Sequence, residues 1–170
     1  QTELRRQEQD YLFDKMCEWL LFNQLDFNYI AESLLPELYR ESNDCRFHVG
    51  EMAYDVILIP PMETMRESTL KRLQQFADNG GKLIFAGEVA NLVDAIPSEK
   101  VKSLASNSMQ VPALEAVLAD ALTPYADVRV IKNTGLPHDA ALYQLREEDG
   151  KRYLFICDTR KEGTKAWCKI

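Results

Sequence analysis

The sequence has little that would suit a metal or redox centre built on sulfur. Its four cysteines, Cys17, Cys45, Cys157 and Cys168, stand far apart and form no CxxC or other close pair. Zinc sites and redox pairs use cysteines at short spacings, so we expect neither, and no metal. Each cysteine lies in or beside an apolar stretch, where a thiol usually acts as a small buried hydrophobic group.

Positive charge is also scarce. The chain has 20 Lys and Arg against 27 Asp and Glu, a net charge of -7 at pH 7. Nucleic acids and anionic membrane surfaces attract basic proteins, so we expect neither as a partner. No apolar run approaches the roughly 18 residues of a spanning helix, and no signal peptide is apparent. Because the chain opens at Gln1 and a strand-like stretch stops at Ile170, we expect a piece of a longer protein. A cytoplasmic location is slightly favoured, and export stays open.

Motifs for nucleotide cofactors and for nucleophilic catalysis are absent as well. Neither GxGxxG nor GxxxxGK[ST] occurs, and Gly80-Gly81 follows an expected helix instead of opening one, so no cofactor is expected. A nucleophile elbow needs Ser or Cys at the turn after a strand, but the turn after Phe85 reads Ala-Gly-Glu-Val-Ala. His48 and His138 form no visible Ser-His or Cys-His arrangement, and we interpret them as surface or turn histidines.

What the sequence does contain is apolar material for a core, 46% of its 170 residues. Residues 54–61 (YDVILIPP) form a continuous apolar run ended by prolines, which is typical of a central parallel strand covered on both faces. A helical apolar stripe follows over 70–77, with Thr64 to Glu67 or Ser68 expected as its N-terminal cap and an end at Gly80-Gly81. Residues 82–87 read as a second buried strand. A strand, a helix and a strand in this order predict a parallel crossover unit.

The remaining segments follow from local pattern. We expect helices over residues 2–24, 31–39 with an interruption near Pro36, 89–93, 99–104 and 112–122, the last closed by Pro124, and a polar loop over 106–109 leading to Gln110 and Val111. We expect strands over residues 26–30, 45–49, 127–131, 140–146, 152–157 and 164–170, with a hairpin turn at Glu148-Asp149-Gly150. Because no helix is expected beyond Pro124, we predict an α/β domain over 1–124 and an antiparallel β extension over 125–170.

Candidate binding residues follow from the rule that ligands of open α/β sheets bind beyond the carboxyl ends of the strands. The loops after the two expected parallel strands each carry one carboxylate, Glu63 and Glu88, and Thr64 and Asn91 can add hydrogen bonds. Two such acids could act as general acid and base or hold sugar hydroxyls. The alternative is that both acids lie near helix N-termini, where negative charge is favourable. We assign these four residues to ligand binding and assign no catalytic residue.

Three segments carry a resemblance to a known module. They are residues 25–30 (LDFNYI), 54–64 (YDVILIPPMET) and 79–87 (NGGKLIFAG). Together they resemble the glutamine-amidotransferase-like domain inside large bacterial glycoside hydrolases, most closely the α-L-rhamnosidase-like group with family-2-type sugar-binding domains. The tail from Tyr143 to Thr159 looks like the lead-in to the β-sandwich that follows in those proteins. The resemblance covers about two thirds of the chain.

The resemblance implies a doubly wound, flavodoxin-like three-layer α/β fold of the class I glutamine amidotransferase type, without its first strand and with a short antiparallel β tail. In related hydrolases such domains have lost the cysteine nucleophile and serve assembly or wall the substrate cleft, and Gly87-Glu88 here agrees with that loss. We therefore expect a non-catalytic structural or interaction module of a bacterial glycoside hydrolase. Its expected partners are neighbouring domains of the same polypeptide, a second copy of the chain, or a carbohydrate. The alternatives are a stand-alone hydrolase that uses Glu63 and Glu88, and a small-ligand, sugar-binding domain.

Overall fold

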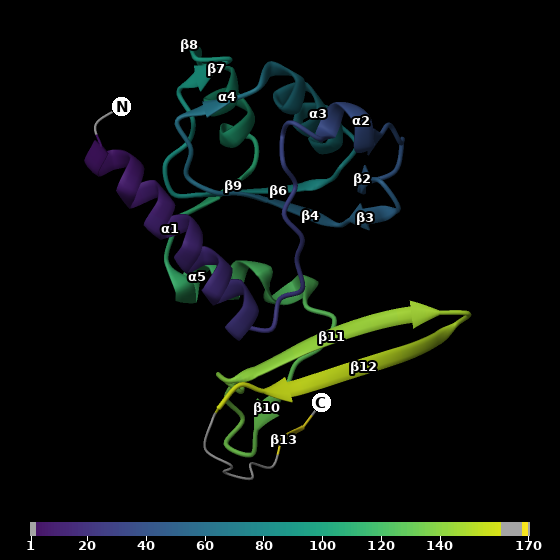
Figure 1. Ribbon diagram of the computed structural model, residues 1–170. Helices are drawn as coiled ribbons and strands as arrows, with labels where there is room; N and C mark the ends of the chain where they lie inside the picture. Colours follow the sequence, from purple (N-terminus) through teal and green to yellow (C-terminus); the bar gives the residue numbers. More distant parts are fainter. Residues whose placement is uncertain (1–2, 161–167, 170) are drawn as a thin grey trace. The chain divides into compact units, whose positions relative to one another are not determined.

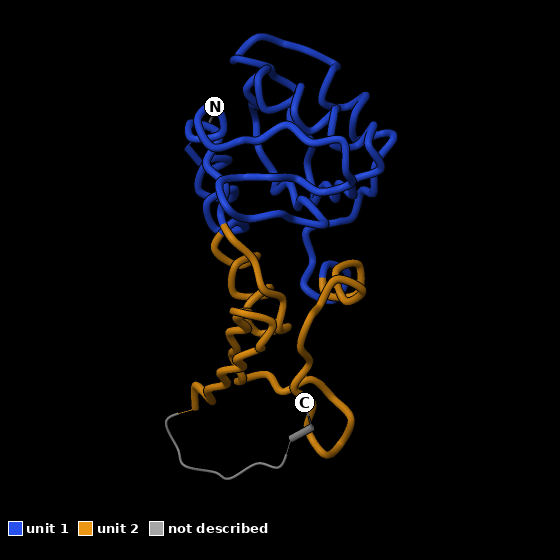
Figure 2. The backbone as a smooth tube through the Cα atoms, turned by 90° about the vertical axis from the view of Figure 1, so that its right-hand side faces the viewer, with its two compact units in different colours: residues 1–13, 29–118 blue, residues 14–28, 119–170 orange. Residues whose placement is uncertain are grey.

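The computed structural model describes residues 3–160 and 168–169 and shows a mixed α/β protein with several small sheets (Figure 1). The chain divides into two compact units (Figure 2). The first contains residues 29–118 and the chain up to Phe13, and the second contains residues 14–28 and the chain from Ala119 on. The second unit therefore takes its residues from both sides of the boundary expected at Pro124. Among the described residues, no helix has the length and apolarity needed to cross a membrane.

A three-stranded parallel sheet in the order β4–β6–β9 forms the centre of the first unit. Its strands are β4 (Val56–Ile59), β6 (Lys82–Ala86) and β9 (Met109–Val111). Val56 pairs with Lys82 and Ile59 with Phe85, so the predicted parallel unit is confirmed. The central position predicted for the first strand is wrong, because β6 lies between the other two. An apolar run indicates that the two faces of a strand are covered, but it does not indicate whether the strand is paired at both edges. The short and partly polar β9 was not predicted.

Helix α3 (Glu67–Asp78) joins β4 to β6. Its side chains Leu70, Leu73 and Phe76 belong to the same core cluster as Leu83 and Phe85 of β6. It ends as the sequence predicts. Gly80 has φ +86°, its N–H donates to the Ala77 carbonyl, and the Gly81 N–H donates to the Phe76 carbonyl, both at 2.9 Å. These two bonds form a Schellman motif.

The predicted N-terminal cap of α3 is wrong. Arg66 holds the cap position and makes no side-chain cap bond. Thr64 belongs instead to strand β5 (Thr64–Met65), and its hydroxyl accepts a hydrogen bond from the Ala95 N–H at 3.0 Å. The Thr64 hydroxyl is therefore bonded to the segment after β6 and does not cap α3.

The helix predicted over residues 89–93 is not formed. Strands β7 (Leu92–Val93) and β8 (Ile96–Pro97) make a hairpin there, and β5 pairs with β7 in parallel. Asp94 and Ala95, at the turn, have φ of +48° and +64°, the left-handed conformation that two-residue hairpin turns require. The next helix, α4 (Lys100–Ser106), confirms the one predicted over 99–104. Figure 1 shows α3 and α4 on the same face of the parallel sheet.

The segments before β4 agree only in part with the sequence. Helix α1 (Glu3–Phe22) is as predicted, but residues 26–30 form no strand, because β-favouring side chains make a strand only where an edge is available to pair with. Pro36 lies in the first turn of α2 (Leu35–Leu38), where proline is tolerated, and so begins that helix instead of interrupting it. A small antiparallel sheet follows, made of β1 (Tyr39–Arg40), β2 (Phe47–Val49) and β3 (Met52–Tyr54).

Helix α5 (Glu115–Leu122) confirms the last predicted helix, although Pro124 lies in a 3₁₀ turn, η1 (Thr123–Tyr125), that continues it. The strands of the second unit are β10 (Ile131–Lys132), β11 (Ala141–Glu148), β12 (Lys151–Asp158) and β13 (Cys168–Lys169). Residues 164–167 and 170 of the last predicted strand lie outside the described residues. The predicted hairpin is confirmed, with Asp149 and Gly150 at φ +51° and +71°.

Candidate functional site

A hollow of about 540 Å³ lies in the first unit at the carboxyl end of the parallel sheet. Each of the three parallel strands contributes to its wall directly or within a few residues of its end: Pro61 after β4, Gly87 and Glu88 after β6, and Ala113 after β9. The first turns of α1 supply the rest of the wall, with Leu4, Arg5, Glu8, Gln9 and Leu12. We call this cavity the strand-end hollow. It lies at the edge where ligands of open parallel sheets bind.

An ion pair stands at the wall of the strand-end hollow. Arg5 Nη2 lies 2.5 Å from Glu88 Oε1, and the two side chains are 39% and 61% exposed. An exposed pair of this kind contributes little to folding stability. Its two polar groups are instead held in place beside the cavity, where they can donate to and accept from a ligand.

Gly87 allows the strand ends to approach one another below Glu88. Its φ is +72°, and a Cβ at this position would lie 3.0 Å from Pro61 Cγ and 3.3 Å from Ala113 Cβ. Its N–H donates to the Val111 carbonyl at 2.8 Å. A side chain here would be both strained and crowded, so glycine sets the close packing of the three strand ends.

The two loops proposed from the sequence lie side by side. Thr64 is paired with Leu92 in the parallel β5–β7 ladder, and the Leu92 N–H donates to the Glu63 carbonyl at 3.2 Å. The Asn91 carbonyl accepts from the Ser98 N–H at 3.0 Å. The Leu92–Glu63 bond and the Thr64 hydroxyl, which accepts from the Ala95 N–H, hold the two loops together, whereas the Asn91–Ser98 bond closes the β7–β8 hairpin within the second loop.

Only one of the four predicted binding residues lines the strand-end hollow. Glu88 is part of its wall, whereas Glu63, Thr64 and Asn91 are not. The sequence missed the contribution of α1, in particular Arg5. The contact of Arg5 with the strand ends could not be predicted from its position on an amphipathic helix. Helical periodicity distinguishes the buried face from the polar face but does not indicate which residues contact the polar face.

The lining of the strand-end hollow combines polar and apolar side chains. It offers one guanidinium, two carboxylates and one amide beside the apolar side chains of Leu4, Leu12 and Pro61, and it contains no Ser, Cys, His or Tyr. Within the part of the chain that is described, no three His, Cys, Asp or Glu residues come together as a metal site. Such a lining fits a ligand rich in hydroxyl groups that also has an apolar face.

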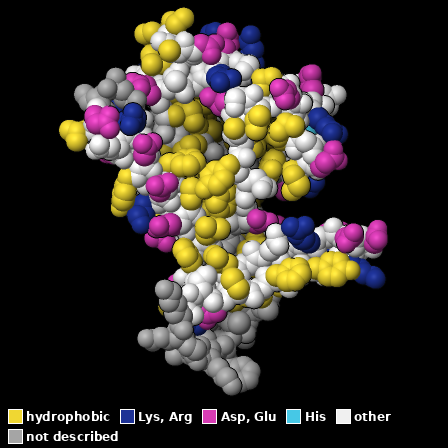
Figure 3. All heavy atoms as spheres, in the orientation of Figure 1, with side chains coloured by type: hydrophobic (Ala, Val, Ile, Leu, Met, Phe, Trp, Pro, Cys, Tyr) yellow, Lys and Arg dark blue, Asp and Glu magenta, His cyan; other side chains and the backbone are white. Residues whose placement is uncertain are grey.

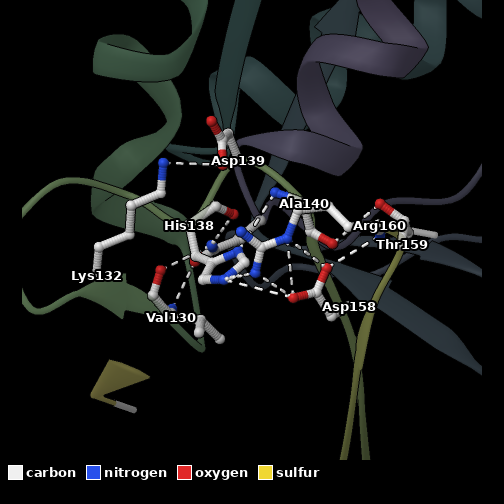
Figure 4. Close-up of polar contacts among 9 residues, drawn as sticks. Val130, Lys132, His138, Asp139, Ala140, Asp158, Thr159 and Arg160 are labelled. Atoms are coloured by element: carbon white, nitrogen blue, oxygen red, sulfur yellow. Dashed lines mark hydrogen bonds and ion pairs between the residues drawn. The ribbon is translucent and has the colours of Figure 1, made fainter. Parts of the chain in front are cut away.

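The histidines differ from the expectation. His138 is buried, with 4% of its surface exposed, so its assignment to the surface is wrong. The main-chain N–H of His138 donates to the Val130 carbonyl at 2.9 Å, and its ring Nε2 lies 3.1 Å from Arg160 Nη2. Figure 4 shows the imidazole next to Arg160 and Asp158. His48 lies within β2 and is half-buried, with Nε2 2.9 Å from Asp44 Oδ2.

The cysteines also differ from the expectation of burial. Cys45 and Cys157 are exposed and Cys17 is half-buried, while the side chain of Cys168 lies outside the described residues. Cys157 stands on β12, every residue of which is exposed. An apolar sequence neighbourhood predicts burial only where another layer covers the strand, and the described residues supply none on this side of the hairpin.

Arg160 controls the protonation of Asp158 in the second unit. Its guanidinium and its N–H hydrogen-bond the carboxylate and hold the pKa of Asp158 well below the ordinary 3.8. Because the folded pKa is the lower one, the pair stabilises the fold above about pH 4, and this stabilisation is lost as the pH falls through the folded pKa. We expect Arg160→Gln to raise the Asp158 pKa toward 3.8 in a carboxyl ¹³C NMR titration. Arg46→Gln, which removes a partner of Asp55 instead, should leave the Asp158 pKa unchanged, and an unchanged value in Arg160→Gln would contradict the assignment.

Comparison with known proteins gives no relative: no family, no curated protein and no solved structure matches the chain.

Proposed function

We propose that the chain is a non-catalytic structural or interaction module of a bacterial glycoside hydrolase, and that its strand-end hollow faces carbohydrate. Its arrangement would be the doubly wound, class I glutamine-amidotransferase-like one that residues 25–30, 54–64 and 79–87 resemble. The parallel order β4–β6–β9, with α3 and α4 on one face, is compatible with such an arrangement. Its partners would be neighbouring domains of the same polypeptide.

The composition of the strand-end hollow is the observation that carries this proposal. Sugars are held by planar polar side chains that bond adjacent hydroxyls and by apolar surfaces that meet their C–H groups. Arg5, Glu88, Glu8 and Gln9 supply the first kind of group, and the leucines of α1 supply the second. The preformed Arg5–Glu88 pair lowers the entropy cost of ordering two of these side chains.

The alternative of a stand-alone hydrolase has less support. Glycoside hydrolysis uses two carboxyl groups that face one bond. Glu88 lines the strand-end hollow and Glu63 does not, and Glu88 is already bonded to Arg5. The second acid in the lining, Glu8, was not among the candidates drawn from the sequence. The alternative of a small sugar-binding domain shares the same hollow and the same residues.

A panel of neutral sugars tests the proposal. We expect one class of monosaccharide or disaccharide to raise the melting temperature of the chain, this rise to disappear in Glu88→Gln, and aryl-glycosides not to be hydrolysed. Glu99→Gln is the matched control, since Glu99 is an exposed acid that pairs with Lys102 and does not line the hollow.

Two results would contradict the proposal. Turnover of an aryl-glycoside that is lost in Glu63→Gln or Glu88→Gln would favour the hydrolase. If no sugar in the panel changes the melting temperature, the strand-end hollow is not a carbohydrate-binding site.

A further inference from the structure

Strand β12 has a partner on one edge only among the described residues. It pairs with β11, and the two form a two-stranded sheet. All eight of its residues are exposed, and four successive large apolar side chains are 37–61% exposed: Tyr153, Leu154, Phe155 and Ile156. Figure 3 shows hydrophobic side chains along this hairpin and charged ones at its tip. An open edge beside exposed apolar side chains is a template for another strand.

The register of the hairpin decides which backbone groups are available. A two-residue turn at Asp149-Gly150 makes Glu148 and Lys151 a hydrogen-bonded pair, and bonded and non-bonded pairs alternate from there. The bond from the Thr159 N–H to the Ala140 carbonyl, at 2.8 Å, fits the same alternation. The N–H and C=O groups of Arg152, Leu154, Ile156 and Asp158 therefore point away from β11.

We propose that β12 pairs in antiparallel orientation with β12 of a second copy of the chain. The two-fold axis passes between the two copies of Phe155 and is perpendicular to the resulting four-stranded sheet. In this register Leu154 lies opposite the partner's Ile156, and Arg152 lies opposite the partner's Asp158. The outward backbone groups of one strand then meet those of the other, and the same patch serves both copies.

Charge complementarity selects this register and this occupant. The arginine near one end of β12 meets the aspartate at the other end of the partner strand, and the two-fold axis repeats the match. Within each copy Arg152 also pairs with Glu147, and Asp158 with Arg160, so each meeting point joins two acidic and two basic side chains. A shift by two residues in one direction places Asp158 opposite the partner's Gly150 and leaves Arg152 opposite an apolar side chain. The opposite shift places Arg152 against the partner's Arg160. Opposite charges on facing strands stabilise a sheet and like charges destabilise it.

The apolar side chains support the same register. Phe155, the most exposed of the four at 61%, lies opposite its own copy in a non-hydrogen-bonded pair, where the Cα atoms approach to about 4.5 Å. On the same face, Tyr153 lies opposite the partner's Cys157. Pairing therefore covers the aromatic side chains that the hairpin leaves open.

Two proline variants at one cross-strand pair test the proposal. Leu145 and Leu154 face one another in the hairpin, and their N–H groups point to its two opposite edges. Proline at either position spares the bonds within the hairpin and removes a donor from one outer edge. We expect the wild type and Leu145→Pro to have twice the monomer mass by light scattering, and Leu154→Pro to be a monomer with an unchanged circular dichroism spectrum. A monomeric wild type at every concentration, a dimer lost in Leu145→Pro but kept in Leu154→Pro, or open-ended oligomers would overturn the proposal.

A cysteine cross-link tests the register without depending on the stability of a proline variant. In a background with Cys45→Ser and Cys157→Ser, Phe155→Cys brings two thiols together across the axis, at a Cα separation that a disulfide accepts. We expect mild oxidation to convert this variant to a covalent dimer. Gln144→Cys, on the same face and paired with Phe155 across the hairpin, should remain monomeric on a non-reducing gel. Absence of the cross-link in Phe155→Cys, or equal cross-linking of both variants, would overturn the register.

Discussion

Replacing Gly81 with alanine is expected to lower the free energy of unfolding of the first unit by roughly 2–4 kcal/mol. A Cβ at this position would lie 2.2–2.4 Å from three ring carbons of Phe76. The ring has no room to move, because Phe76 is only 2% exposed and stands edge-on to Phe47 with ring centroids 5.5 Å apart. The added methyl group must displace either the core or the end of α3.

Gly80→Ala is the matched control for this variant. Gly80 is the neighbouring residue of the same Schellman motif, with a φ of +86° and open space where its Cβ would stand. Gly80→Ala should lower the free energy of unfolding only by the strain of an alanine in the left-handed conformation, about 1 kcal/mol. Urea denaturation of both variants gives the comparison.

A second substitution separates crowding from strain. In Gly81→Ala combined with Phe76→Leu, the smaller side chain leaves room for the methyl group, so the combined loss should be well below the sum of the two single losses. Additive losses, or a Gly81→Ala variant no less stable than Gly80→Ala, would show that the contact with Phe76 does not limit this position.

Replacing Gln24 with alanine is expected to destabilise the second unit by about 3 kcal/mol. Gln24 is 2% exposed, and its amide joins two distant segments. Its Nε2 donates to the carbonyls of Val130 and His138 at 2.8 and 3.1 Å, and its Oε1 accepts from the Val130 N–H at 2.5 Å. Alanine leaves that buried N–H without its acceptor. Faster hydrogen exchange at the Val130 amide would report the loss, and Gln144→Ala, at an exposed glutamine of β11, should leave it unchanged.

Gln24→Glu keeps the shape of the side chain and tests whether the amide itself is needed. A carboxylate oxygen would replace the donor that faces two carbonyl oxygens, so the folded state should favour the protonated acid and raise its pKa. A raised folded pKa means that stability is fully present below the unfolded pKa of about 4.3 and is lost as the pH rises. We expect melting temperatures of this variant to fall between acid and neutral pH, relative to the wild type. A pH-independent difference would contradict the role of the amide.

The sequence predicted the parts of the fold that local chemistry determines. The parallel pair β4 and β6, helix α3 with its two-glycine end, helix α1 and the Asp149-Gly150 hairpin each depend on residues close together in the chain. The segments predicted wrongly, residues 26–30, 89–93 and most of the strand expected over 127–131, have apolar patterns whose structure depends on which distant strand edge is available.

The candidate site was likewise predicted only in part from the sequence. The carboxyl ends of the strands were expected as the site because strand direction follows from the chain order, and Glu88 lines the strand-end hollow there. The part that α1 contributes, and the burial of His138 and Gln24, depend on contacts between segments far apart in the sequence. The spacing of apolar residues along the chain does not predict contacts between such distant segments.

The bond between Gln24 and Val130 also bears on how the chain reaches its native state. It joins residues 106 positions apart, whereas β4, β6 and β9 succeed one another within residues 56–111. The entropy lost on closing a loop grows with the length of chain enclosed, and contacts between distant positions form slowly. A nascent chain therefore has everything needed to assemble the parallel sheet before the second unit can begin to close, and the latter must wait until residue 130 has been made.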